Sequence, residues 1–73
     1  MDDWYPIQAK QHDKVGRPAI DEFETAMNRA GRAKGFFVAF GYTADALAEI
    51  QRFFTAEHKV IAPLTVREIL AYE

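Results

Sequence analysis

The sequence of 73 residues has no cysteine, only three prolines and no long apolar run. The absence of cysteine excludes disulfide bonds and thiolate metal sites. The longest uninterrupted apolar run, residues 36–40, is far shorter than the roughly 20 residues that cross a bilayer. The acidic start also lacks the basic and apolar regions of a signal peptide. We therefore expect a cytoplasmic chain without membrane association.

A strong charge of one sign is also missing, because 9 basic side chains face 11 acidic ones and the net charge is -2. This balance gives no general attraction to nucleic acid, so any DNA contact must be local. What the chain does have is apolar residues, at 49% of the total, with aromatic side chains spread along its length. A chain this short removes only roughly 60% of its unfolded surface from water. We expect one small domain over residues 1–73.

The first regular pattern is an alternation over residues 4–11, which is typical of a strand with one buried face. The apolar side of this strand carries Tyr5, Ile7 and Ala9, and we expect that side to be buried. The opposite side carries Gln8 and Lys10, which the period of two places next to each other. The turn after this strand contains Gly16 and leads to Pro18, a residue suited to the first turn of a helix.

Helical and strand patterns then alternate along the chain. A helix is predicted from Pro18 to near Gly31, and its apolar stripe is Ile20, Phe23, Met27 and Ala30. Residues 35–40 are apolar throughout, which predicts a central strand covered on both faces by helices. Thr43 is the expected N-cap of a second helix. The buried stripe of that helix is predicted to be Leu47, Ile50, Phe53 and Phe54, and the phenylalanines at 36, 37, 40, 53 and 54 are assigned to the core.

Residues 59–64 predict a third strand, in which Pro63 favours the strand's end or the sheet's edge. Thr65 and Glu68 have the spacing of a capping box that opens a last short helix. The predicted order is β-α-β-α-β-α, and strands that alternate with helices favour parallel neighbours. The fold class is therefore α/β, with a small, mostly parallel sheet flanked by helices.

Two groups of polar residues are open to either a structural or a functional interpretation. Gln8 and Lys10 are either the solvated face of an edge strand or part of a site. Lys14, Gly16 and Arg17 precede a helix N-terminus and form either a phosphate or DNA contact or a simple helix-capping turn. His12 and His58 lack metal-ligand spacing, and no role is assigned to them.

Several segments, in order, resemble the Mrr-like branch of the PD-(D/E)xK restriction endonuclease-like superfamily. The closest resemblance is to the nuclease-like domain at the C-terminal end of some bacterial site-specific DNA methyltransferases. The segments are Ile-Gln-Ala-Lys-Gln at 7–11, Val-Gly-Arg-Pro at 15–18, and the stretches 20–26, 34–40 and 64–70. The resemblance implies a restriction-endonuclease-like core fragment that would act on DNA.

The resemblance also implies roles for individual residues. In the superfamily, an Asp on one strand and a Glu or Gln, one residue and a Lys on the next bind Mg²⁺ and position a water for phosphodiester hydrolysis. Gln8 would then be a weak metal ligand through its amide oxygen, and Lys10 would polarise the water or stabilise charge on the phosphate. Asp2 and Asp3 lie where a hairpin turn is expected, so the preceding acid and its N-terminal hairpin strand are expected to be missing. We therefore expect no nuclease activity and no bound Mg²⁺ for this chain alone.

Alternatives to this incomplete site stay open. Asp21 and Glu24, on the first helix, are either substitute acids or residues favoured by the positive end of the helix. The whole domain is a degenerate nuclease, a non-catalytic module that binds DNA or protein, or an interaction domain. An uncovered strand edge predicts a homodimer. DNA is the other expected partner, bound weakly.

Overall fold

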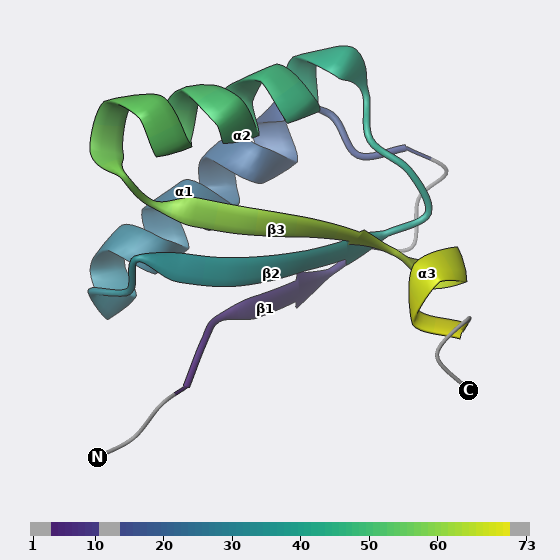
Figure 1. Cartoon of the computed structure of the whole chain (residues 1–73), viewed down its shortest axis with the longest axis horizontal. Coiled ribbons are helices and arrows are strands. Elements are labelled where there is room, and N and C mark those ends of the chain that lie inside the picture. Colours follow the sequence, from purple (N-terminus) through teal and green to yellow (C-terminus); the bar gives the residue numbers. More distant parts are fainter. Residues whose placement is uncertain (1–3, 11–13, 71–73) are drawn as a thin grey trace.

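The computed structural model describes residues 4–10 and 14–70. The predicted order of elements is confirmed, and Figure 1 shows their arrangement. No helix in these two stretches is long and apolar enough to cross a membrane. The elements are β1 (Ile7–Ala9), α1 (Arg17–Ala30), β2 (Lys34–Ala39), α2 (Ala44–Glu57), β3 (Val60–Thr65) and α3 (Val66–Leu70).

The three strands form one parallel sheet in the order β1-β2-β3. The prediction that residues 35–40 provide the central strand is confirmed. Gln8 pairs with Phe37, which in turn pairs with Pro63. Pro63 lies in the edge strand β3, as predicted. An edge strand tolerates proline because it has no neighbouring strand on its outer side.

Both long helices pack on the same face of the sheet, because each right-handed crossover from one strand to the next leaves its helix on the same side. On β2 this face carries Gly35, Phe37 and Ala39, all buried. Phe23 of α1 packs edge-on against Phe37, with ring centroids 5.5 Å apart. The buried apolar core is Val15, Ile20, Phe23, Met27, Phe37, Ala39, Ala46, Phe53 and Ile61.

The prediction for the buried side of the first strand is wrong. Gln8 shares the helix-covered face with Phe37, whereas Ile7 is 68% exposed on the opposite face. The cause is the single-sided placement of α1 and α2, which leaves the other face without a helix layer. We call this other face the bare face. It carries Ile7 and Ala9 of β1, Phe36 and Val38 of β2, and Ala62 and Leu64 of β3.

Two further predictions about burial are also wrong. β2 is covered by helices on one face only, and Phe40 at its end is 57% exposed. On α2 the fully buried residues are Ala46, Glu49 and Phe53, while Leu47 and Phe54 are about half exposed. The buried stripe of α2 is rotated because this helix packs against α1 as well as against β3.

The predicted helix boundaries are confirmed by their capping groups. Gly31 ends α1 in the left-handed conformation with a φ of 67°, which glycine adopts without a Cβ penalty. The Thr43 hydroxyl accepts a hydrogen bond from the Ala46 N–H at 3.2 Å. At α3, the Thr65 N–H donates to Glu68 Oε1 and the Glu68 N–H donates to Thr65 Oγ1, at 2.8 and 3.1 Å. This reciprocal pair is the predicted capping box.

Tyr42 fastens the carboxyl ends of β2 and β3. Its hydroxyl lies 2.7 Å from the carbonyl oxygens of both Phe37 and Leu64 and donates its one hydrogen to either. Burial raises the pKa of Tyr42 to about 12. The neighbouring backbone is also tied, since the Val15 N–H donates to the Gly41 carbonyl at 2.9 Å. The segment that leads into α1 is therefore fixed to the same end of the sheet as the ends of β2 and β3.

Candidate functional site

Gln8 and Lys10 line a hollow between the edge strand β1 and helix α1, which we call the β1–α1 hollow. It has a volume of about 240 Å³. Both side chains are half-buried and lie on the same side of β1. The α1 residues that complete the lining are Ala19, Glu22, Phe23 and Ala26. The pair predicted from the alternation thus lies in a concave place between two elements.

The amide of Gln8 is turned so that its nitrogen faces the backbone. Nε2 donates a hydrogen bond of 3.4 Å to the carbonyl oxygen of Ala9. A primary amide has one nitrogen and one oxygen, so this orientation leaves Oε1 available as an acceptor or as a ligand for a hard cation.

Lys10 follows directly on β1, and its backbone is held by the central strand. The Lys10 N–H donates to the carbonyl of Val38 at 3.0 Å. Within residues 4–10 and 14–70, no carboxylate comes within ion-pair distance of the Lys10 amine. This ammonium can therefore stabilise an anion that enters the hollow.

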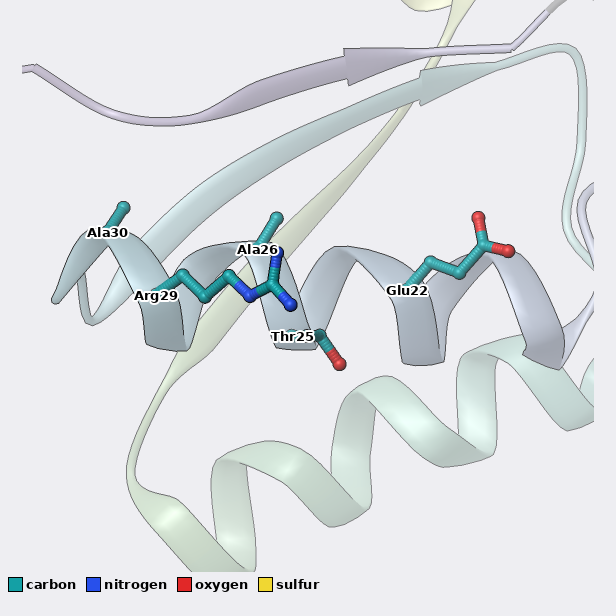
Figure 2. A pocket seen from close by; sticks show the side chains of 5 residues that line it. All are labelled: Glu22, Thr25, Ala26, Arg29 and Ala30. Atoms are coloured by element: carbon teal, nitrogen blue, oxygen red, sulfur yellow. The ribbon is translucent and has the colours of Figure 1, made fainter.

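A shallow, open groove of about 560 Å³ lies on the surface of α1 and adjoins the β1–α1 hollow. Figure 2 shows the five residues that line this groove: Glu22, Thr25, Ala26, Arg29 and Ala30. Glu22 and Ala26 line both the groove and the hollow. In Figure 2 the Glu22 carboxylate lies on the side of α1 that faces the strands, away from α2.

Asp21 and Glu24, the predicted substitute acids, lie with Glu49 of α2. One carboxylate oxygen from each of these three residues lies within 4.8 Å of the others. Arg52 pairs with both glutamates, at 2.6 Å from Glu49 Oε2 and 3.7 Å from Glu24 Oε1. Neither Asp21 nor Glu24 lines the β1–α1 hollow. The structure therefore places this acid pair with α2 and the Gln8–Lys10 pair with β1.

The two glutamates of this acid cluster titrate in opposite directions. Burial, followed by the neighbouring Glu49 carboxylate, raises the pKa of Glu24 to about 8. The hydrogen-bonded Arg52 guanidinium lowers the pKa of Glu49 to about 2. Glu24 Oε2 is buried without a hydrogen-bond partner in the part of the chain that the structure describes. At neutral pH, Glu24 is therefore the protonated member and Glu49 the ionised one.

The predicted phosphate-contact residues lie at the start of α1. Gly16 is its N-cap and offers no side-chain hydrogen bond. Arg17 extends toward two acids, with ion-pair distances of 3.7 Å to Asp21 and 3.6 Å to Glu49. Lys14 is exposed. Of the two histidines, His58 ends α2 in a left-handed conformation, and His12 lies outside the described residues.

A parallel β-α-β-α-β-α unit, with Gln8 in its edge strand and Lys10 directly after that strand, is consistent with a restriction-endonuclease-like α/β domain. The chain matches a restriction endonuclease family, that of the Mrr catalytic domain, over residues 2–62, and it belongs to that family. Among curated proteins and solved structures, none gives a significant match.

Nucleases of this family use Mg²⁺. The donors of the β1–α1 hollow fit such a hard cation, because the amide of Gln8 and the carboxylate of Glu22 both offer oxygen. Mg²⁺ keeps several waters in most protein sites, so two protein oxygens are compatible with it. Sequence reasoning did not find Glu22. Its position is signalled by helical spacing, since residues 19, 22, 23 and 26 share one face of α1.

Proposed function

We propose that this chain is the part of a Mg²⁺-dependent DNA endonuclease domain that carries the Gln-x-Lys pair. Its support is the placement of Gln8 and Lys10 side by side in the β1–α1 hollow of a chain from a restriction endonuclease family. When bound, Mg²⁺ would polarise the phosphate and an attacking water, and the Gln8 amide oxygen would be one of its ligands. Lys10 would stabilise negative charge on the phosphate.

The cellular setting follows from this assignment. DNA cleavage of this kind belongs to restriction and modification, and the proposed association is with bacterial DNA methyltransferases in the cytoplasm. Because the resemblance implies a further acid on a preceding strand for a full metal site, we propose that this chain alone does not hydrolyse DNA. Supercoiled plasmid is expected to stay intact with the chain and Mg²⁺. Nicks that disappear in Lys10→Ala would contradict this proposal.

Duplex binding tests the DNA-directed role of the site without requiring cleavage. The chain is expected to bind a short duplex weakly, with an affinity that falls as salt rises, because phosphate contacts release counterions. Lys10→Ala should weaken binding at every sequence and reduce the salt slope by about one. Fluorescence anisotropy at several salt concentrations measures both quantities.

The matched control is Lys34→Ala, which removes the same charge from the other face of the sheet, where Lys34 lies over the Tyr5 and Phe36 rings. This variant should bind duplex as the wild type does. A duplex affinity that does not change with salt concentration, or an equal loss of affinity in both variants, would reject the site as the DNA-contacting surface.

A second candidate function, self-association without catalysis, is favoured by the exposure of Ile7. This side chain is 68% exposed on the bare face, beside the outer edge of β1. Within the described residues, β1 pairs only with β2. Unpaired strand edges with exposed apolar side chains promote pairing between chains. We propose that two copies associate through β1 and the adjoining bare face.

Sedimentation equilibrium tests this association. The wild type is expected to be a dimer, and Ile7→Lys should shift it to monomer by placing a charge in the contact. Leu47→Lys is the matched control, because Leu47 is exposed to 47% on α2, away from the bare face. A monomeric wild type, or equal dissociation in both variants, would reject this mode of association.

A further inference from the structure

Helix α1 presents one acidic side chain to the β1–α1 hollow. Ala19, Glu22, Phe23 and Ala26 recur at helical spacing and form the α1 wall of the hollow. Phe23 of this face is buried in the core, which fixes the rotation of α1 about its axis. The rotation that seats Phe23 under the sheet therefore also directs Glu22 toward the hollow.

The other two acids in this part of α1 are already engaged elsewhere. Asp21 lies 3.7 Å from the guanidinium of Arg17. Glu24 is buried against Glu49 and Arg52. Glu22 differs from both, because among the described residues it makes no ion pair and it is exposed to solvent. Its carboxylate is thus available to a ligand in the hollow.

We propose that Glu22 supplies the carboxylate that, together with the amide oxygen of Gln8, binds a divalent cation in the β1–α1 hollow. Water and, with DNA present, a phosphate oxygen would complete the ligand set that Mg²⁺ prefers. Lys10 lines the same hollow, where its ammonium would stabilise the negative charge of that phosphate. This inference rests on the proposed nuclease-like function and assigns it a residue outside the Gln-x-Lys motif.

Glu22 is expected to contribute more to cation affinity than Gln8, because its side chain is charged. An amide oxygen is neutral, and the Lys10 ammonium in the same hollow repels a cation. An ionised carboxylate offsets this repulsion, so that the three side chains together carry no net charge. Without the Glu22 carboxylate, the hollow would present a cation with an amide dipole and a positive charge only.

Mn²⁺ binding, followed by the loss of the free-ion paramagnetic resonance signal, tests the proposal without any requirement for DNA cleavage. The resemblance alone implies no bound Mg²⁺, whereas this proposal predicts that the wild-type chain binds one Mn²⁺ and that added Mg²⁺ competes for it. Glu22→Gln should lower the affinity for Mn²⁺ at least about tenfold. In other metal sites, mutating even groups that only support the direct ligands lowers metal affinity by about 10- to 100-fold. Gln8→Ala should also lower the affinity for Mn²⁺. In the double variant the two losses should not be additive, because both residues bind the same ion.

Controls separate Glu22 from the other acids. Asp45→Asn removes an exposed acid from the first turn of α2 and should leave Mn²⁺ binding unchanged. Asp21→Asn and Glu24→Gln test the acid cluster between the helices, and a loss in these variants with normal binding by Glu22→Gln would overturn the proposal. Wild-type chain that binds no Mn²⁺ would overturn it too. The duplex-binding test of Lys10→Ala is independent of this one. It measures contact with the phosphate anion, whereas the Mn²⁺ titration measures binding of the cation.

Discussion

Replacing Gly35 with alanine is expected to lower the free energy of unfolding by about 1–3 kcal/mol, the usual cost of overpacking a core. A Cβ at this position would lie 2.9 Å from the Phe23 ring and 3.1 Å from Met27 Sδ. Phe23 is only 4% exposed and is held against Phe37, so its ring has little room to move. Urea unfolding followed by circular dichroism gives the free energy.

The matched control for Gly35→Ala is Gly16→Ala. A Cβ at Gly16 meets only Pro18 Cδ at an ordinary 3.6 Å, and the backbone there is extended. This variant should lose less free energy of unfolding than Gly35→Ala, since its expected cost is only the lower preference of alanine for the N-cap position. The double variant Gly35→Ala with Phe23→Leu should be less destabilised than the sum of its single changes, since the smaller side chain makes room for the new methyl. Strict additivity would show that the close approach is not the cause.

The stability of the domain is expected to fall as the pH rises from about 4.5 to about 8, and Glu24→Gln should remove this fall. The folded chain keeps the proton on Glu24 up to a pKa of about 8, whereas the unfolded chain loses it near 4.5. Between these values the folded state binds more protons, so raising the pH favours unfolding, and above about 8 the loss is complete. A displacement of this size corresponds to a few kcal/mol.

Glutamine imitates the protonated glutamate, since its amide is neutral and can donate a hydrogen bond to the Glu49 carboxylate. Above pH 8, Glu24→Gln should therefore have a higher midpoint of thermal unfolding than the wild type, and near pH 4.5 the two should agree. On the acid side, the pKa of about 2 for Glu49 makes stability rise from about pH 2 to about 4.5. In Glu49→Gln this rise in stability with pH should be absent. A Glu24→Gln profile parallel to that of the wild type across the neutral range would refute the assignment of the proton to Glu24.

Much of the fold follows from local patterns in the sequence. The elements, their order and their caps depend on short-range spacing, as at Thr65 and Glu68, and these predictions are confirmed. The parallel sheet follows from the alternation of strands and helices. What local patterns could not provide is the side of the sheet on which the helices lie. Ile7 looks like a core residue from its alternation alone, yet the helices cover the side of Gln8.

The candidate site was predictable in part for the same reason. Gln8 and Lys10 are separated by one residue on a strand, so their common side follows from the sequence. Glu22 enters the site only through the packing angle of α1 against β1, which no local pattern specifies. Glu24 was an equally reasonable choice from spacing, and its partnership with Glu49 and Arg52 depends on α2 lying beside α1.

The three-residue length of β1 has a consequence for the order in which parts of the domain open. β2 and β3 are joined over six residue pairs, and the Tyr42 hydroxyl links their carboxyl ends. β1 is joined to β2 over only three pairs. Segments with fewer buried contacts and backbone hydrogen bonds open at a lower free energy than the whole domain. β1, which carries Gln8 and ends one residue before Lys10, therefore has the lowest local stability in the sheet, and a ligand in the β1–α1 hollow would protect its amides from exchange with solvent.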